Sequence, residues 1–462
     1  MRSGHHQRSA PLRIALVAIF FSIHCGNAMA QEAGSQALRS GDDAPSEDAD
    51  SSPRSRFFSD SKLTLSFRNY AEHLDIERVA KRKGWVQAMQ VRFESGMTEG
   101  PVGFGLEATP FVAVKLDGGE GSRNLVRLEP DGSGQGDNHW GYMGTYALKV
   151  SFADTMVKIG KQEIKNPYLD PYDIRASPPS FRGASFTNNS FEGVTLTGGT
   201  FDAVNARGAT RLQRLSTTYS GIEYDRLSYL GSDWKLSRGV DLALYLSQAR
   251  DVWNQHYISV SKRSESERGI TWTVKADAYF TDEQGRKLQG DIDNLAASLM
   301  LSASYGPSNV VLGYQRIHGD QFFDFAEETS GIYLVNSRGL DYNAPNERSF
   351  QVRYRFDGNS AGIPGFQASI WRIRGWGVDA GDEARRNADP DAALHGLYWR
   401  NGRPIEGSHA EHGLQFRYTV QKGTFKGMSL MYVHIRHSMD PGYPSRNFKT
   451  NRVMINYTIP IF

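Results

Sequence analysis

Cysteine is almost absent from this chain of 462 residues, and its single example is Cys25. That residue lies in a segment with the features of a secretion signal: an arginine-containing start, an apolar run over 14–23 and small residues on either side of Met29. Residues 1–30 are therefore expected to be a signal peptide that is cleaved after Ala30. The chain that remains would hold no disulfide, no thiol nucleophile and no cysteine ligand for a metal.

Long apolar runs and an excess of one charge are missing as well. The run over 14–23 is shorter than the about 20 residues that a transmembrane helix needs. No second such run follows it, and the mean hydropathy is −0.51, which excludes a helical membrane protein. Residues 1–30 contain three arginines and no acid, so the 53 basic residues fall to 50 against 51 acidic ones. This balance argues against nucleic acid as a partner.

Aromatic side chains, glycine and a period of two are abundant. The chain holds 21 Tyr, 24 Phe, 8 Trp and 47 Gly, and Leu63, Leu65 and Phe67 alternate with polar residues. Similar runs recur along the chain, separated by Gly, Asp, Asn and Pro. Such alternation fits strands with one face toward lipid and one toward water, at about 24 residues per strand and connection. We therefore predict an all-β fold, a transmembrane antiparallel β-barrel of about 18 strands over residues 59–462.

The sequence also indicates how this barrel begins and ends. Residues 31–58 are rich in Ser, Gly, Asp and Ala, which predicts a disordered periplasmic extension. Residues 453–462 alternate again and close on the aromatic Phe462. An aromatic carboxyl end is typical of outer-membrane barrels, whose last strand pairs with the first. We expect a location in the outer membrane of a Gram-negative bacterium, and recognition of the last strand by the barrel-assembly machinery.

The most distinctive stretch runs from Phe93 to Gly119 and reads FESGMTEGPVGFGLEATPFVAVKLDGG. It resembles the OprD family of substrate-specific outer-membrane porins, which carry a run of the form SGxTxGxVGFGxDAxxxxxxKLDxG. Glu107 stands where the family usually has Asp. The likeness continues in the same order through 178–199, 310–325 and 361–379. This resemblance implies a channel whose third and seventh loops fold inward and form an eyelet.

Arginines recur on strand faces that are expected to line the lumen. Phe350, Val352 and Tyr354 should face lipid, which turns Arg353 and Arg355 inward. We apply the same reasoning to three later strands, taking Trp371 with Ile373, Leu414 with Phe416 and Tyr418, and Met431 with Val433 and Ile435 as their lipid-facing sets. These strands are predicted to add four inward arginines: Arg372, Arg374, Arg417 and Arg436.

These six arginines suggest a path for anions. A guanidinium stays charged and can hold a carboxylate through two parallel hydrogen bonds. An arginine that faces lipid at mid-membrane would cost about 2–4 kcal/mol. The family resemblance implies that such a row acts as a basic ladder for substrates. The alternative is that the arginines pair with lumenal acids such as Glu94, Glu107 or Asp341 and only hold the wall together.

The resemblance also implies six residues that narrow the channel. Proline stiffens the expected third loop at Pro178 and Pro179. From the third and seventh loops we expect the constriction to contain Arg175, Phe181, Arg182, Asp324, Tyr333 and Asn336. Phe322 and Phe323 of the seventh-loop region are expected to narrow the channel as well. The alternative for these two residues is a place in the aromatic girdle at the membrane surface.

The sequence shows no motif for catalysis or for a bound metal. His409 and His412, like His434 and His437, are closely spaced but have no partnering ligand cluster, and no nucleophile elbow is present. We expect no enzyme, no cofactor and no metal. The predicted function is passive, selective uptake of small water-soluble carboxylates (amino acids, aromatic or other organic acids) by a monomer or weak homo-oligomer. A less selective general diffusion porin and a barrel enzyme or adhesin remain as alternatives.

Overall fold

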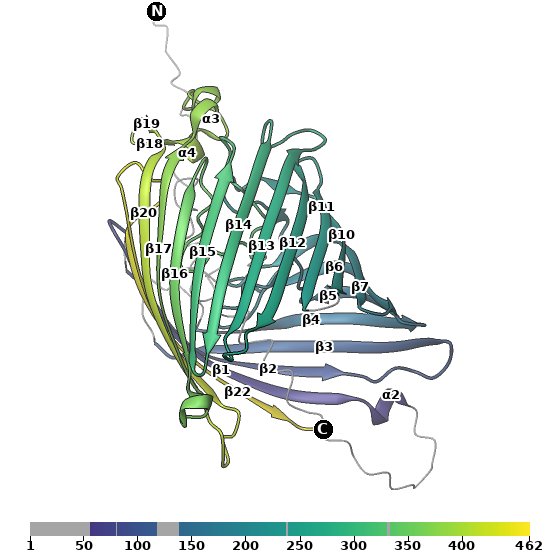
Figure 1. The fold of residues 1–462 in the computed structure, drawn as a ribbon. Coiled ribbons are helices and arrows are strands. Elements are labelled where there is room, and N and C mark those ends of the chain that lie inside the picture. Colours follow the sequence, from purple (N-terminus) through teal and green to yellow (C-terminus); the bar gives the residue numbers. More distant parts are fainter. Residues whose placement is uncertain (1–55, 80, 118–137, 237–238, 330–332) are drawn as a thin grey trace, which may run out of the picture.

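A computed structural model of the chain describes residues 56–79, 81–117, 138–236, 239–329 and 333–462. The expected signal peptide and most of the 31–58 extension lie outside these residues. Residues 56–58, the end of that extension, belong to the short helix α2 (Arg56–Ser59). In the described part, 18 strands form one antiparallel sheet, which closes into a barrel (Figure 1).

The barrel is built by strands of 8 to 15 residues. They are β1 (Lys62–Ile76), β2 (Arg82–Glu94), β3 (Val102–Lys115), β4 (His139–Phe152), β5 (Thr155–Gln162), β6 (Ser180–Phe191), β7 (Val194–Asn205), β10 (Leu227–Leu236), β11 (Val240–Ala249), β12 (Trp253–Glu265), β13 (Thr271–Glu283), β14 (Asp293–Tyr305), β15 (Ser308–His318), β16 (Arg348–Asp357), β17 (Phe366–Asp379), β20 (Glu406–Thr419), β21 (Ser429–Met439) and β22 (Phe448–Pro460). The connections contain β8 (Leu215–Ser216), β9 (Glu223–Tyr224), β18 (Trp399–Arg400), β19 (Arg403–Pro404), the helices α3 (Gly381–Arg386) and α4 (His395–Tyr398), and the 3-10 turn η3 (Gly358–Ala361).

The last strand closes the barrel against the first. β1 and β22 pair in antiparallel register from Thr64 opposite Pro460 onward. The pairing extends to the end of the chain, since the Leu63 N–H donates to the Phe462 carbonyl at 3.0 Å and the Ile461 N–H to the Leu63 carbonyl at 2.8 Å. Closure leaves no strand edge facing lipid. The predicted barrel of about 18 strands is confirmed.

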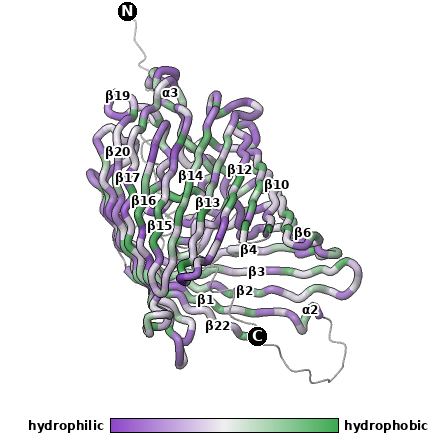
Figure 2. The backbone as a smooth tube through the Cα atoms, in the orientation of Figure 1, coloured by the Kyte–Doolittle hydropathy of each residue, from purple (hydrophilic) through white to green (hydrophobic). Residues whose placement is uncertain are grey.

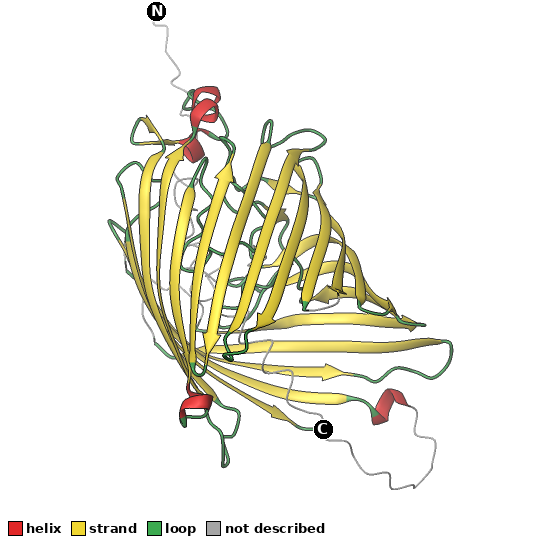
Figure 3. Cartoon of the chain, in the orientation of Figure 1, coloured by secondary structure: helices red, strands yellow, loops and turns green. Residues whose placement is uncertain are grey.

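The two ends of the barrel differ in their connections. At one end β1 begins and β22 ends, and several strands are joined by tight turns such as 153–154 and 306–307. The other end carries the 163–179, 206–226 and 319–347 loops, together with α3 and α4, which stand at the top of Figure 3. Among the residues that the structure describes, no helix is long and apolar enough to cross a membrane.

Side chains alternate between an outer and an inner face along each strand. On β16, Phe350, Val352 and Tyr354 are 39–46 % exposed, whereas Ser349 and Gln351 are completely buried. Figure 2 shows hydrophobic residues recurring along β13 to β16, and hydrophilic colour at β19 and α3. The outer face is therefore the apolar one, as a lipid environment requires.

The core of the molecule lies inside the barrel because the long loops fold into it. Tyr168, from the 163–179 loop, is buried and donates through its hydroxyl to the Tyr245 carbonyl at 2.8 Å. The Tyr279 hydroxyl donates in turn to the Pro167 carbonyl at 3.0 Å. These wall and loop aromatics belong to one buried cluster, which also includes Phe323. The loops are thus held against the wall by packing and by hydrogen bonds, and they narrow the lumen.

Candidate functional site in the barrel lumen

Arg353, Arg355 and Arg417 lie on the inner face of the barrel, the orientation that the alternation predicts. Arg353 is 5 % exposed, and its register partner on β17 is the buried Trp371. Arg417 follows Phe416, which is 44 % exposed on the outer face. Three of the six expected ladder arginines therefore point into the lumen.

The other three point outward, so their predicted orientation is wrong. Arg372 and Arg374 are exposed on β17. Trp371 and Ile373, which alternate with them along the strand, are 3 % and 0 % exposed. Arg436 is exposed on β21 in the same way. None of these three side chains can line the channel.

The inward-folded 319–347 loop explains this inversion. Its Leu340 and Tyr342 pack against Trp371 and Ile373 in one buried cluster, to which Val433 and Ile435 of β21 also belong. The indole N–H of Trp371 also donates to Glu411 at 2.6 Å, inside the barrel. At this level the apolar contact lies on the lumenal side, so apolar residues turn inward and their charged neighbours turn outward.

The third-loop candidates are separated by the structure. Arg175 lies in the 163–179 loop and is 8 % exposed, and its carbonyl accepts a hydrogen bond from Arg68 at 2.9 Å. Burial and the nearby Arg207 lower the pKa of Arg175 to about 10. Phe181, at 0 % exposure, belongs to β6 and to the aromatic core. Arg182 was expected at the constriction, but it is exposed on the outer face of the barrel. The buried Phe181 beside it takes the inner face of β6, so Arg182 points the other way.

The outward Arg182 has a partner of its own on the neighbouring strand. Its Nε donates to Asp202 on β7 at 2.8 Å, and both side chains are about half exposed. Asp202 lies between the buried Phe201 and Ala203, which face the lumen. The pair is therefore a surface pair of the barrel wall, and the constriction does not contain Arg182.

The seventh-loop candidates are anchor points inside the barrel. Asp324 accepts hydrogen bonds from the Tyr219 and Ser220 N–H groups at 2.9 and 3.0 Å, although its burial raises its pKa. Asn336 is fully buried and donates to Ser349 on β16 at 2.8 Å.

Three aromatic candidates of the same loop also lie inside the barrel. The ring of Tyr333 packs at a tilt beside that of Tyr257, with 5.9 Å between ring centroids. Phe322 and Phe323 are 4 % and 1 % exposed, in buried clusters with other loop and wall residues. They are thus lumenal and do not belong to an aromatic girdle.

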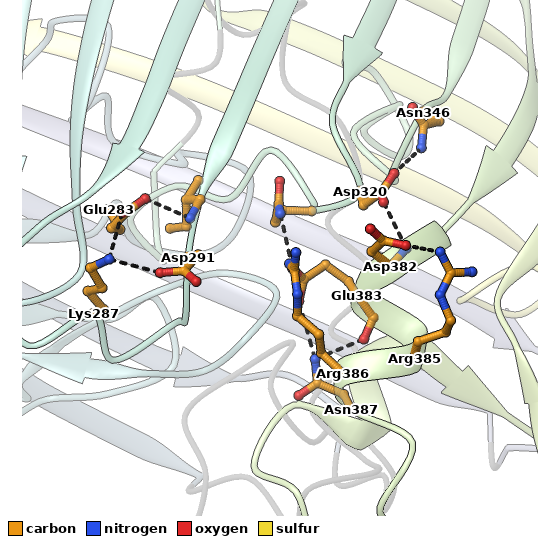
Figure 4. Close-up of polar contacts among 12 residues, drawn as sticks. Glu283, Lys287, Asp291, Asp320, Asn346, Asp382, Glu383, Arg385, Arg386 and Asn387 are labelled. Carbon is orange, nitrogen blue, oxygen red and sulfur yellow. Dashed lines mark hydrogen bonds and ion pairs between the residues drawn. The ribbon is translucent and has the colours of Figure 1, made fainter.

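A polar network fixes the 319–347 loop at the rim of the barrel. Asp320 accepts hydrogen bonds from Asn346 and from the N–H of Asp382 in α3, both at 2.8 Å (Figure 4). Glu383 of α3 accepts from Gln321 at 3.1 Å and is paired with Arg386. The loop is therefore tied to the next surface loop as well as to the wall.

Four further arginines line the inner wall, and our sequence reasoning did not include them in the ladder. They are Arg68 on β1, Arg82 and Arg92 on β2, and Arg452 on β22. The alternation of Leu63, Leu65 and Phe67 already turns Arg68 inward, so the same rule applied earlier in the chain could have found it. With Arg353, Arg355 and Arg417, they place seven inward arginines on the sector from β16 through β22 to β2.

A cavity of about 180 Å³ lies between this wall and the 163–179 loop. Arg68 and Arg92 line it from the wall, and Glu163, Asp173 and Pro178 from the loop. Two cations thus face two acids across a narrow polar space. Such an arrangement sets up a transverse field in the channel.

The two cavity arginines differ in how firmly they are held. Arg68 binds Asp173 through both terminal nitrogens, at 2.8 Å for one of them, and donates from Nε to Asn456 at 2.7 Å. Among the described residues, Arg92 makes one polar contact, from Nη2 to Glu163 at 3.3 Å, and its side chain is 43 % exposed. Arg92 therefore keeps donors that an entering anion can use, whereas Arg68 is occupied by the loop.

Other lumenal arginines also have donors to spare. The Nε atoms of Arg175, Arg353 and Arg417 are buried and have no hydrogen-bond partner among the described residues. Arg417 makes a weak contact of 3.4 Å from Nη2 to the Met431 sulfur. A buried N–H without a partner is unfavourable. A carboxylate or water in the lumen would satisfy these groups.

Two of the three acids that were considered as structural partners, Glu107 and Asp341, are engaged elsewhere. Glu107 pairs with Lys158 at 2.7 Å. Asp341 accepts hydrogen bonds from Ser337 and, at 3.2 Å, from Tyr219. Neither acid pairs with a ladder arginine in the part of the chain that the structure describes.

Comparison with known proteins places this barrel in a family. A family model described as "outer membrane porin, OprD family" matches residues 55–461. The chain belongs to the OprD family of outer-membrane porins. It is 28 % identical over 422 residues to Porin D of Pseudomonas aeruginosa, covering 88 % of this chain and 92 % of that protein. OprD porins are channels of the Gram-negative outer membrane and not enzymes, and this chain shares that location and class.

Solved structures of OprD-family porins superpose on the barrel. OccD3 (OpdP) of Pseudomonas aeruginosa is 28 % identical, with a TM-score of 0.78 and coverage of 88 % of this chain and 93 % of that one. OpdK of the same organism, solved with vanillate, is 25 % identical, with a TM-score of 0.78 and coverage of 87 % and 100 %. OccK2 (OpdF), in complex with glucuronate, is also 25 % identical, with a TM-score of 0.74 and coverage of 88 % and 100 %. Both ligands are small organic acids bound by those relatives.

Proposed function

We propose that this porin is a passive, selective channel for small water-soluble carboxylates, which move along its lumenal arginines. The observation that carries the proposal is the set of guanidinium groups with unused donors, Arg92, Arg353 and Arg417, on one sector of the inner wall. A carboxylate can accept two hydrogen bonds from each and then pass to the next. Each hydrogen bond between the carboxylate and an arginine replaces a hydrogen bond to water or to another lumenal group. The net binding free energy at each arginine is therefore small enough for release.

The substrate class is supported by two kinds of argument. Vanillate and glucuronate, found with the relatives OpdK and OpdF, each carry one carboxylate. In this chain three long loops narrow the lumen, and the cavity of about 180 Å³ beside Arg92 has a size that suits a small solute. A wide general diffusion porin would not place three loops inside its barrel, so selective uptake is favoured.

Planar-bilayer recording on the full chain tests this function. Benzoate and benzamide have the same shape, and only the acid is charged at neutral pH. Benzoate should block the single-channel current, and benzamide at equal concentration should not. Replacing Arg353 and Arg417 together by Gln should raise the benzoate concentration for half-block at least tenfold, and more in dilute buffer, because salt screens charges beyond about 8 Å at 0.15 M.

The outward arginines supply a matched control. Arg372→Gln with Arg374→Gln removes the same charge from the same part of the wall, but on the face away from the lumen. Benzoate block should be unchanged in this variant. Equal loss of block in both double variants, or equal block by benzoate and benzamide, would contradict a lumenal carboxylate path.

We also propose export with cleavage after Ala30 and assembly through the last strand. N-terminal sequencing of the purified porin should begin at Gln31. Removal of Phe462, whose carbonyl bonds to Leu63, should reduce the amount of protease-resistant barrel in the outer membrane. Undiminished barrel from the truncated chain would argue against a role of this strand in recognition by the assembly machinery.

A further inference from the structure

A band of arginines lies on the outer face of the barrel near the long-loop end. It comprises five exposed arginines and one exposed histidine on five neighbouring strands: Arg316 (β15), Arg348 (β16), Arg372 and Arg374 (β17), His412 (β20) and Arg436 (β21). We call these six residues the outer basic band. They cannot serve the lumen, because the wall separates them from it.

The strand register brings the members of the band next to one another. Arg316 lies opposite Arg348, and His412 lies opposite both Arg372 and Arg436. Arg374 lies opposite Phe350, which is the next outward residue after Arg348 on β16. Directly opposed side chains have Cβ atoms about 4.5–5.5 Å apart, and like charges at that distance repel.

No acid in the described part of the chain compensates for this repulsion. In the described residues, the guanidinium groups of Arg316, Arg348, Arg372, Arg374 and Arg436 make no ion pair or hydrogen bond. The outward acids of these strands, Asp379 and Glu406, face each other further toward the loops. Asp75 is paired with Lys449 on β22 at 3.3 Å. A row of unpaired cations is therefore open to an external anion.

The position of the band along the strands identifies what surrounds it. On β15 the outward residues Val310, Leu312 and Tyr314 come before Arg316. On β16, which runs antiparallel to β15, Arg348 comes first and the apolar outward residues Phe350 and Val352 follow it. The apolar band thus ends where the basic band begins. That boundary is the level of the lipid headgroups, where the cost of an arginine falls to about 0–1 kcal/mol.

We propose that the outer basic band binds the phosphate groups of an anionic membrane lipid in the leaflet at the long-loop end. Arginine forks match phosphate geometry and are less strongly hydrated than lysine. Basic clusters at membrane level bind anionic headgroups by the same forces. Occupation by phosphate would remove the repulsion along the row and hold one lipid at a fixed place on the barrel.

The opposite sector of the barrel shows that the band is local. On β6 and β7 the outward Arg182 is neutralised by Asp202 at 2.8 Å. On β12 and β13 the outward His256 lies 3.7 Å from Asp282. Each of these outward basic side chains thus has an acid beside it, whereas the arginines of the band on β15 to β21 do not. The lipid site is confined to this sector.

Native mass spectrometry of the full chain released from detergent tests the proposal. The probe is lipid A, a glycolipid with two phosphates, and its dephosphorylated form is the reference. The wild-type porin should bind lipid A at least tenfold more tightly than the reference. Arg372→Gln with Arg436→Gln should abolish that preference, and Arg372→Lys with Arg436→Lys should retain part of it. Arg182→Gln, outward but paired, should leave it unchanged.

Three results would overturn the proposal. One is equal lipid A binding by the wild type and the Gln variant while both run as folded barrels in a heat-shift gel. Another is binding of free pyrophosphate as strong as that of lipid A, which would indicate a site for soluble anions. The third is a change from oligomer to monomer in the Gln variant without lipid, which would make the band an interface between copies.

Discussion

Arg207 and Glu328 form a buried ion pair that joins two loops inside the barrel. The guanidinium Nε lies 2.7 Å from the carboxylate, and the two side chains are 3 % and 10 % exposed. The Glu328 carboxylate also accepts the backbone N–H of Arg207 at 3.0 Å. The guanidinium stacks on Tyr172 of the 163–179 loop, 3.8 Å from the ring centroid. One arginine thus links all three loops that narrow the lumen.

Loss of this pair should loosen the loops. Burial alone would raise the pKa of Glu328, but Arg207 lowers it, so the pair is ionised at neutral pH. Glu328→Gln leaves Arg207 buried without a counter-charge, which costs about 3–5 kcal/mol in typical buried pairs. We expect noisier single-channel current and faster cleavage of the 206–226 loop by trypsin.

A surface pair in the same 206–226 loop provides the comparison. Asp225→Asn removes an exposed partner of Arg214, and such pairs contribute about 0–1 kcal/mol. This variant should match the wild type in current noise and in trypsin sensitivity. If Glu328→Gln behaves like Asp225→Asn, the loops are held by packing alone.

Arg92 and Arg68 should respond differently to the same substitution. Arg92→Gln removes a half-exposed group with one contact, so acid block should weaken several-fold with the barrel's heat stability unchanged. Arg68→Gln strips Asp173 of its bidentate partner and frees the 163–179 loop, so stability should fall and conductance should rise. Bilayer recording and heat-shift gels measure both quantities. If both variants change acid block, conductance and heat stability in the same way, the ion pair between Arg68 and Asp173 does not hold the 163–179 loop.

Asp170 should make loop docking depend on pH. Its burial raises its pKa from 3.8 to about 6, although Lys165 and Tyr333 oppose this. Between these two values the folded loop binds more protons than the released loop, so docking weakens as pH rises from about 4 to about 6 and then stays constant. Current noise should follow this course. In Asp170→Asn, the rise of current noise between about pH 4 and about pH 6 should become smaller, because this carboxyl no longer titrates. If the variant has the same pH dependence of current noise as the wild type, Asp170 is not its source.

Gly413 should not tolerate a side chain. It lies opposite Trp371, and a methyl group there would meet the indole ring at 1.9 Å. Gly413→Ala must displace Trp371 and break its bond to Glu411, so we expect a loss of about 1–3 kcal/mol as in overpacked cores. Gly396→Ala is the control, since a methyl group at that position has no neighbour within 4 Å. The heat-shift temperature should fall for the first variant only.

The fold could be predicted because a barrel in lipid leaves a local signature. Lipid covers the outer face of every strand, so alternation such as Phe350, Val352 and Tyr354 repeats wherever the chain crosses the membrane. The closing strand carries its own signature in 453–462. These patterns need only neighbouring residues, which is why the strand number, the closure and the family followed from the sequence.

The direction of individual side chains near the loop end was decided by tertiary contacts. Trp371 and Ile373 look like lipid-facing residues, but Leu340 and Tyr342 come from a loop that folds back against them. That contact spans some thirty residues, and periodicity contains no information about it. The rule that apolar residues face outward holds only where the lumen contains water.

The sequence by itself therefore determined the barrel, its membrane and the inward place of Arg353, Arg355 and Arg417. Only the tertiary structure decided that Arg372, Arg374 and Arg436 lie on the outer face of the barrel, and that Arg68 and Arg92 line the cavity with the 163–179 loop. The physical reason is that alternation assigns residues to two faces of a strand, while the loops inside the barrel decide which of those faces is apolar.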